Sequence, residues 1–372
     1  MGYAERREKV FEWMAAEDLS AVMFEDCEHR RDQAIRYLSG HPCDALLFLT
    51  ADKKTLLVPW DVNMAQRYAQ VDNIVEYNNF GLNPIKACIE CALRLKIPTG
   101  GKIEIPSCTS YPDFLKYVNT KAQIDFICRE NGAASFIEKL RSIKDDDEIN
   151  IYRKVSDITN KIILSIEKKV VDGELKTESD VALFIENECR KYGCEGTGFI
   201  TLAAGSGRSF GIHCFPSYSG GEFADKGLSI LDFGLVYQGY TSDVTMTFAR
   251  NKLSAKQKNQ IDLVKEAFDI AFSKVQVGVS CKTIATAVDN FFKKHDVFMP
   301  HGLGHGIGLQ AHEAPYLRNR AACDTPLQAG MIFTIEPGLY DTAEGGCRYE
   351  NDVLLTENGA EILTKSKIVV LD

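Results

Sequence analysis

Hydrophobic positions in the first third of the chain alternate between helical spacing and the short apolar runs that are typical of buried strands. Helices and strands that follow one another in this way predict an α/β domain, which we expect to occupy residues 1–125. This segment holds no cluster of acids, bases or metal-binding side chains. The predicted elements are a helix at 5–18, strands at 21–24, 45–50 and 54–60, a turn ending at Gly40, a helix at about 82–96 and a strand at 102–106.

The remainder of the chain, residues 130–372, has a different pattern, in which a pair of helices occurs twice. A long helix is predicted to begin near Asp145 and a second helix after Gly173, and about 105 residues later the same order returns near Ser254 and Gly278. Each long helix starts with a capping-box pattern, and glycine-rich strands follow each pair. The recurrence predicts a pseudo-symmetric domain with a site between its halves; a chance similarity of the two segments is the alternative.

Composition narrows the class of protein. The chain is 45% hydrophobic and 26% charged, as globular proteins are, and its net charge of -9 disfavours a nucleic-acid partner, which needs clustered Lys and Arg. No apolar run is as long as a membrane span and the first residues lack the apolar part of a secretory signal, so we expect no membrane partner. Twelve scattered cysteines predict reduced thiols in the cytoplasm.

The candidate chemistry begins with two aspartates in the segment 228–248. The segment is predicted to form two apolar strands joined by a turn at Gln238-Gly239. Positions 232 and 243 are centred between 237 and 238, close to this turn, which predicts that Asp232 and Asp243 are near neighbours across the strand pair. Like charges directly opposite destabilise a strand pair, so the two carboxylates need a shared proton or a cation. A solvated hairpin with two surface acids is the alternative, which the apolar neighbours disfavour.

Two glutamates stand in similar settings. Glu336 lies in the apolar run MIFTIEPGLY and Glu350 lies at the start of the strand predicted in GGCRYENDVLL, although glutamate is rarely buried unpaired. The glycine-rich stretch 301–315, HGLGHGIGLQAHEAP, adds three of the seven histidines. Four carboxylates and one imidazole suit a pair of divalent ions such as Mn²⁺, Co²⁺ or Zn²⁺, and such pairs activate water for hydrolysis.

These pieces, in this order, resemble the metal-dependent peptidase family with the pita-bread fold, which includes methionine aminopeptidase, aminopeptidase P and Xaa-Pro dipeptidase (prolidase). The resemblance covers residues from about 130 to 372. Residues 1–125 resemble the non-catalytic N-terminal domain of the creatinase, prolidase and aminopeptidase P branch. The implied fold class is α/β (α+β), with this creatinase-like domain before a pseudo-symmetric pita-bread catalytic domain. The motifs that carry the resemblance are Asp232-Phe-Gly with Asp243, HGLGHGIGLQAHEAP, TIEPGLY and CRYEND.

The resemblance implies that two divalent metal ions bind per chain, with Mn²⁺ expected and Co²⁺ or Zn²⁺ as alternatives. Asp243 and Glu350 would bridge the two ions. A metal-bound water would be the nucleophile, and Glu336 would take its proton. The implied metal ligands are Asp232, Asp243, His305, Glu336 and Glu350.

The resemblance also implies roles for residues that do not bind metal. His213 and His312 would donate hydrogen bonds to the scissile carbonyl or to the tetrahedral intermediate. His301 would lie near the substrate, and Arg348 would orient Glu350 or bind substrate.

The chain departs from the family pattern beside His213. Many relatives have Pro immediately before this histidine, where this chain has Ile212. Arg208 lies where a small or amide residue is common, and it is interpreted either as a ligand for a substrate carboxylate or as a solvated loop residue. The departure bears on substrate preference rather than on hydrolysis.

The function implied is that of a cytoplasmic, homodimeric dinuclear metallopeptidase. It would remove the N-terminal residue of short peptides and favour Xaa-Pro substrates, as Xaa-Pro aminopeptidases and Xaa-Pro dipeptidases do. One alternative is a creatinase-like hydrolase of a non-peptide amide or amidine. The other alternative is a catalytically inactive binding module, which the complete ligand set disfavours.

Overall fold

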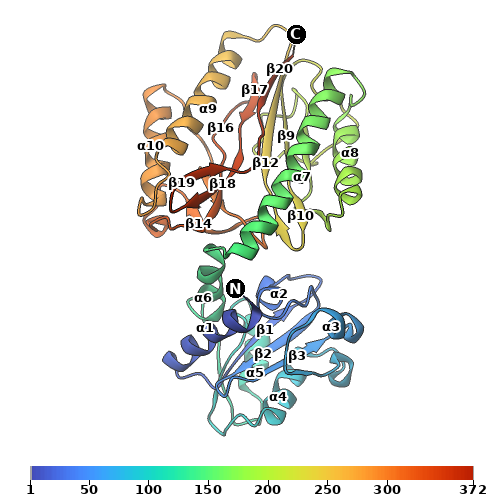
Figure 1. Ribbon diagram of the computed structural model, residues 1–372, viewed down its shortest axis with the longest axis vertical. Coiled ribbons are helices and arrows are strands. Elements are labelled where there is room, and N and C mark those ends of the chain that lie inside the picture. Colours follow the sequence, from blue (N-terminus) through green and yellow to red (C-terminus); the bar gives the residue numbers. More distant parts are fainter. Residues whose placement is uncertain (1, 372) are drawn as a thin grey trace. The chain divides into compact units, whose positions relative to one another are not determined.

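The computed structural model describes residues 2–371 and divides into two compact units between Leu140 and Arg141 (Figure 1). Each unit has its own sheets and its own apolar core, and the two are treated separately below. Within the described residues, no helix is both long and apolar enough to cross a membrane.

The first unit is built on one six-stranded sheet of order β4-β3-β2-β1-β5-β6. β1 lies inside the sheet, antiparallel to β2 and parallel to β5, and all but one of its residues are buried. The buried apolar residues of these strands pack with those of α4, including Phe48, Cys88 and Cys91. The strands are β1 (Ala21–Asp26), β2 (Ala45–Thr50), β3 (Thr55–Pro59), β4 (Asn73–Ile74), β5 (Lys102–Glu104) and β6 (Asp125–Ile127).

The elements predicted for this unit are confirmed, and the structure adds short ones. The predicted turn is the end of a helix, α2, whose C-cap residue is Gly40. Gly40 has φ +80°, the left-handed conformation that glycine favours. The added helices are too short for a clear periodicity. The helices are α1 (Tyr3–Ala16), α2 (Gln33–Ser39), α3 (Val62–Tyr68), α4 (Pro84–Arg94), α5 (Tyr111–Val118), α6 (Ala133–Ser142) and the 3₁₀ turn η1 (Tyr77–Phe80).

The second unit contains the two predicted helix pairs. Asp145 accepts hydrogen bonds from the backbone at Asp147 and Glu148, and Ser254 accepts one from Gln257, so both predicted capping boxes are confirmed. In Figure 1 the pair α7 and α8 and the pair α9 and α10 flank the strands on opposite sides. The helices are α7 (Asp146–Val171), α8 (Glu178–Lys191), α9 (Ala255–Ser273), α10 (Cys281–Lys294) and the 3₁₀ turn η2 (Ala321–Cys323).

Two sheets form the framework of this unit. One has the order β20-β12-β9-β8 and the other β14-β13-β15-β18-β19, with two smaller sheets, β11-β10-β7 and β16-β17, beside them. The apolar faces of α9 and α10 pack on the second sheet through a large buried cluster. The strands are β7 (Gly196–Thr197), β8 (Leu202–Ala204), β9 (Gly227–Phe233), β10 (Leu235–Tyr237), β11 (Tyr240–Thr241), β12 (Val244–Arg250), β13 (Gly304–Gly306), β14 (Glu313–Leu317), β15 (Ile332–Ile335), β16 (Gly338–Asp341), β17 (Gly345–Arg348), β18 (Asn351–Thr356), β19 (Gly359–Ile362) and β20 (Ile368–Leu371).

The predicted hairpin and its turn are present, but Asp232 and Asp243 are not directly opposite each other. Gln238 and Gly239 form its two-residue turn, with φ values of +50° and +87°. Tyr237 therefore pairs with Tyr240, and the register that follows places Thr245, not Asp243, opposite Asp232. Because residues two apart on a strand project to the same face, Asp243 is a diagonal rather than a direct neighbour of Asp232.

Candidate active site

The site lies where the two large sheets of the second unit meet. Thr245 of β12 and Glu350, which precedes β18, form an isolated antiparallel bridge in which the Glu350 N–H donates to the Thr245 carbonyl at 3.2 Å. The Thr245 hydroxyl donates to the Glu350 carboxylate at 2.6 Å. Since Thr245 also stands opposite Asp232, this one threonine links acids from both sheets.

Strand register brings the remaining acids to the same place. Ile335 pairs with Asn351, so Glu336 and Glu350 face each other one step beyond the end of the ladder. Asp243 lies immediately before β12 and Glu336 immediately after β15, so both acids stand at strand ends. Acids at strand ends can converge without interrupting the hydrogen bonds of the sheet.

The distances define a compact cluster around His305, which lies in β13. Its Nε2 is 3.8 Å from an Asp243 oxygen and 3.6 Å from a Glu336 oxygen. One potential ligand atom each from Asp243, His305 and Glu350 lie within 4.8 Å of one another, and all three residues are buried. All five residues that the family resemblance identifies as metal ligands, Asp232 included, line the same cavity.

The His305 ring is oriented for metal binding. Its Nδ1 lies 3.1 Å from the Gly306 carbonyl, which can only accept a hydrogen bond, so Nδ1 carries the proton. The lone pair of Nε2 is then directed toward the carboxylates. Burial lowers the pKa of His305 to about 3, which keeps the imidazole neutral.

The electrostatics of the acids fit a cation. Burial and then repulsion by Glu350 raise the pKa of Asp243 and of Glu336 well above their ordinary values. Burial and the nearby Asp232 raise the pKa of Glu350 to about 7. The Asp232 Oδ1 is buried without a hydrogen-bond partner among residues 2–371. A crowded set of oxygens with an unpaired acceptor is suited to divalent cations, which would hold these acids deprotonated.

Arg348 occupies the centre of a buried hydrogen-bond network and also lines the cavity of the site. It is 2% exposed, and its Nη2 donates to the Asp232 carboxylate at 2.5 Å. Its Nε donates to Thr245 at 2.9 Å, and its Nη1 donates to the Ile212 carbonyl at 3.0 Å and to the Tyr340 hydroxyl at 2.8 Å. The guanidinium thus binds Asp232 directly and is connected to Glu350, the ligand that the family resemblance suggested, through Thr245.

Three further histidines, His213, His301 and His312, line a cavity of about 310 Å³. The four acids and His305 described above line the same cavity. The ring of His312 lies 4.1 Å from that of His305 between centroids. His301 holds its Nδ1 2.8 Å from the Gly302 carbonyl and its Nε2 3.0 Å from the Tyr340 hydroxyl. Burial lowers the pKa of His301 to about 4, so it is neutral at pH 7. His213 reaches the cavity from the irregular segment after β8.

Several residues of the site were not found from the sequence. Thr245 and Tyr340 join the acids, Arg348 and His301 through hydrogen bonds, and Arg318 lines the cavity. Thr and Tyr in strands are ordinary strand residues, so nothing in their local pattern marks them.

Arg208 has neither of the two predicted environments. Its Nε donates to Glu178 at 3.0 Å, and its side chain is 26% exposed. It is absent from the residues that line the cavity.

Comparisons with known proteins agree with this geometry. Residues 150–357, more than half of the chain, match metallopeptidase family M24, and residues 6–97 match the creatinase/prolidase N-terminal domain. The Xaa-Pro dipeptidase of Pyrococcus horikoshii is 28% identical over 98% of this chain and 97% of its own length.

Two solved structures cover almost the whole chain. The X-Pro aminopeptidase of Thermotoga maritima has a TM-score of 0.84 and 26% identity, covering 98% of this chain and 99% of that one. The Xaa-Pro dipeptidase of Bacillus anthracis has a TM-score of 0.82 and 26% identity, covering 99% of both chains. The metal-binding geometry, the matched domains and the shared architecture together place this chain in metallopeptidase family M24, as a peptidase with a creatinase/prolidase N-terminal domain.

Proposed function

We propose that this metallopeptidase hydrolyses the peptide bond after the N-terminal residue of short peptides and favours substrates with proline in the second position. The observation that carries the proposal is the convergence of four carboxylates and the His305 imidazole on one wall of a cavity of about 310 Å³. Relatives along the full length of the chain are an Xaa-Pro dipeptidase and an X-Pro aminopeptidase, which supports the preference for proline.

In this proposal two divalent cations would be held by Asp232, Asp243, His305, Glu336 and Glu350, which all line the cavity. Bound cations would lower the pKa of a water and polarise the scissile carbonyl. Mn²⁺ is the proposed metal, since oxygen-dominated sites favour hard cations. Co²⁺ and Zn²⁺ are the alternatives.

Side chains of the cavity wall then have separate tasks. Glu336, whose carboxylate lies 3.6 Å from the His305 Nε2 and which bound cations would keep deprotonated, would accept the proton of the attacking water. His213 and His312 donate hydrogen bonds to the oxygen that becomes negatively charged in the transition state. Arg348 fixes the orientation of Asp232.

His301 shapes the cavity beside Glu336, whose carboxylate lies 3.7 Å from its Nδ1. Tyr340 accepts from Arg348 and therefore has its own proton free to donate to the His301 Nε2. The neutral ring is thus held in one orientation against the substrate.

The proposal extends to the state of the protein in the cell. The family resemblance implies a homodimer, which sedimentation of the purified chain would test. A cytoplasmic location agrees with the cysteines, none of which forms a disulfide with another described residue.

The test is an assay of metal-loaded protein against Xaa-Pro dipeptides, Xaa-Pro-Yaa tripeptides and matched peptides without proline. We expect release of the N-terminal residue from the proline-containing peptides. Cleavage of dipeptides alone would define a dipeptidase, and cleavage of tripeptides an aminopeptidase. Failure with every peptide, in protein that binds two ions, would reject the proposal in favour of a non-peptide amide as substrate.

A further inference from the structure

The segment 205–219 forms one side of the cavity but has no helix or strand of its own. It follows β8 and carries His213, and its residues Ile212, Cys214 and Ser217 also line the cavity. Irregular backbone is not held in place by a ladder of hydrogen bonds, so side chains must fix the position of His213.

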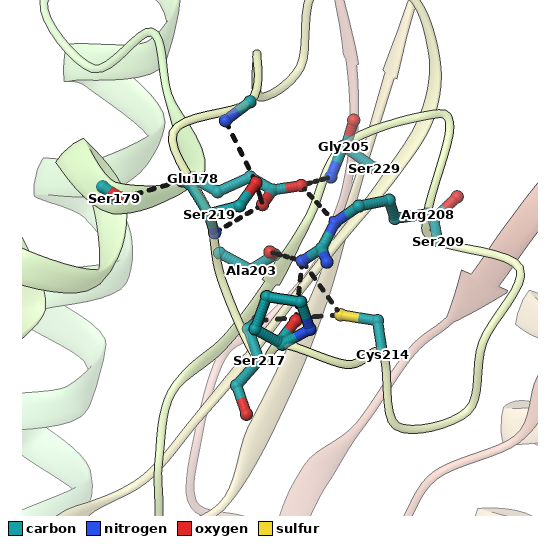
Figure 2. Close-up of polar contacts among 12 residues, drawn as sticks. Glu178, Ser179, Ala203, Gly205, Arg208, Ser209, Cys214, Ser217, Ser219 and Ser229 are labelled. Atoms are coloured by element: carbon teal, nitrogen blue, oxygen red, sulfur yellow. Dashed lines mark hydrogen bonds and ion pairs between the residues drawn. The ribbon is translucent and has the colours of Figure 1, made fainter.

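One buried carboxylate joins the two ends of this segment. Glu178, the first residue of α8, is 1% exposed. It accepts hydrogen bonds from the Gly205 N–H at 2.8 Å and, at the far end, from the Ser219 N–H at 2.7 Å and the Ser219 hydroxyl at 2.6 Å. Figure 2 shows the Glu178 carboxylate between Gly205, Ser219 and Arg208.

Arg208 extends this connection into the middle of the segment. Its Nε donates to Glu178 at 3.0 Å, and its Nη2 donates to the Pro216 carbonyl at 2.8 Å. The same Nη2 lies 3.5 Å from the sulfur of Cys214, next to His213 in the sequence (Figure 2). The guanidinium thus closes a loop of backbone, from 208 to 216, that contains His213.

The backbone just before His213 is held by Arg348, the residue that also binds Asp232. Arg348 donates to the carbonyl of Ile212, the residue before His213, at 3.0 Å. The backbone is therefore fixed before His213 by Arg348 and after it by Arg208 at Pro216. Two rigid planar cations with fixed donor geometry define the position of a loop more closely than flexible lysines would.

The network also explains how a buried acid is tolerated at this place. Burial by itself raises the pKa of Glu178, but the hydrogen bonds from Ser219 and Gly205 and the ion pair with Arg208 outweigh it, so the pKa lies below its ordinary value. The carboxylate also lies in the first turn of α8, where the helix dipole favours negative charge.

We propose that Glu178 and Arg208 are positioning residues, which clamp the segment 205–219 so that His213 points into the cavity. Neither residue contacts the reacting atoms, and the effect on catalysis passes through His213. The inference rests on the proposed function for its catalytic consequence, while the clamp itself can be tested without any activity.

The first test is hydrogen exchange. In Arg208→Ala, the amides of 205–219 should exchange about tenfold faster or more, because a hydrogen-bonded charge pair is lost, while β9 and β12 keep the exchange of the wild type. Arg208→Lys should give an intermediate increase, since an ammonium cannot span Glu178 and Pro216 at once. Unchanged exchange in 205–219 would overturn the clamp.

The second test is kinetic. Arg208→Ala should bind two metal ions as the wild type does, because the five ligands lie on other segments, yet kcat should fall about 10- to 100-fold. In the His213→Ala background the same substitution should have little further effect. Faster exchange without loss of kcat, or independent losses that multiply in the double variant, would overturn the positioning role.

A matched control removes an Arg–Glu pair elsewhere in the same unit. Arg153 donates to Glu361 from both terminal nitrogens, at 2.5 and 2.6 Å, on the surface. Arg153→Ala should match the wild type in kcat and in the exchange of 205–219. If the wild type cleaves no peptide at all, the proposed function fails, and the exchange experiment still decides whether the clamp exists.

Discussion

The guanidinium of Arg348 lies 2.5 Å from the carboxylate of Asp232. The contacted oxygen is Oδ2, while Oδ1 is buried with no hydrogen-bond partner within the described part of the chain. One oxygen of this acid is thus bound by Arg348, and the other is left available for a cation. This division of tasks leads to the first prediction.

Replacing Arg348 by Lys should weaken metal binding without unfolding the unit. The ammonium cannot serve Asp232, Thr245 and the Ile212 carbonyl together, so Asp232 loses its fixed orientation. Loss of a residue that orients a ligand typically costs about 10- to 100-fold in metal affinity. Calorimetric titration of the metal-free variant with Mn²⁺ measures the change, and affinity equal to that of the wild type would contradict the assignment.

Asp243→Ala should abolish peptidase activity and leave the fold largely intact. The acid is buried beside Glu350, and burial and repulsion raise its pKa well above the ordinary value. Its removal therefore relieves repulsion in the metal-free protein, so the Tm in the presence of a chelator should equal or exceed that of the wild type. With metal present, the Tm should be lower than that of the wild type. Metal analysis, melting curves and turnover decide this together, and undiminished turnover would refute the ligand assignment.

Tyr340→Phe should affect substrate binding more than metal binding. The hydroxyl accepts from Arg348 and stands 3.0 Å from the His301 Nε2, so its removal frees the ring of His301 to rotate. One hydrogen bond of this kind is worth about 1 kcal/mol, which corresponds to about a fivefold rise in KM. The number of bound ions should stay at two. A KM equal to that of the wild type would show that the orientation of His301 does not matter for binding.

Glu313→Gln should destabilise the second unit strongly near pH 7. Glu313 is buried and accepts from both Arg141 and Lys144, which are buried as well. Removing the carboxylate charge leaves the two buried cations without a counter-charge, which lowers the free energy of unfolding by about 3–5 kcal/mol. Urea unfolding of the variant and the wild type at pH 7 measures the difference, and a difference below about 1 kcal/mol would contradict the prediction.

The same variant gives a pH dependence with a defined sign. Burial alone raises the pKa of Glu313, but Lys144 and Arg141 outweigh it, so the pKa lies below its ordinary value of 4.5. A lowered folded-state pKa stabilises the protein above about pH 4.5 and loses that contribution as the pH falls through the folded value. The stability difference between wild type and Glu313→Gln should therefore shrink in acid. A constant difference from pH 7 to pH 3 would exclude this origin.

The local parts of this structure could be predicted from the sequence. Capping boxes at Asp145 and Ser254, the turn at Gln238-Gly239 and the strand that ends just before Glu336 depend on residues close together in the chain. The metal-binding residue types could also be predicted, because acids in apolar strands are costly unless a cation binds them. Their order along the chain is also that of the motifs of the pita-bread peptidase family.

Contacts between distant segments could not be predicted in this way. Thr245 pairs with Glu350 across 105 residues, Arg348 reaches Asp232 across 116, and Arg208 reaches Glu178 across 30. Within the hairpin the register is local, since the turn at Gln238-Gly239 pairs Tyr237 with Tyr240 and therefore Asp232 with Thr245.

The sequence by itself therefore determined which side chains are available for chemistry and which short elements carry them. Only the tertiary structure decided which oxygen of Asp232 is free, which acid Arg348 orients and what holds His213 in place. The physical reason is that local preferences act over a few neighbouring residues, whereas strand register and buried ion pairs follow from the packing of the whole unit.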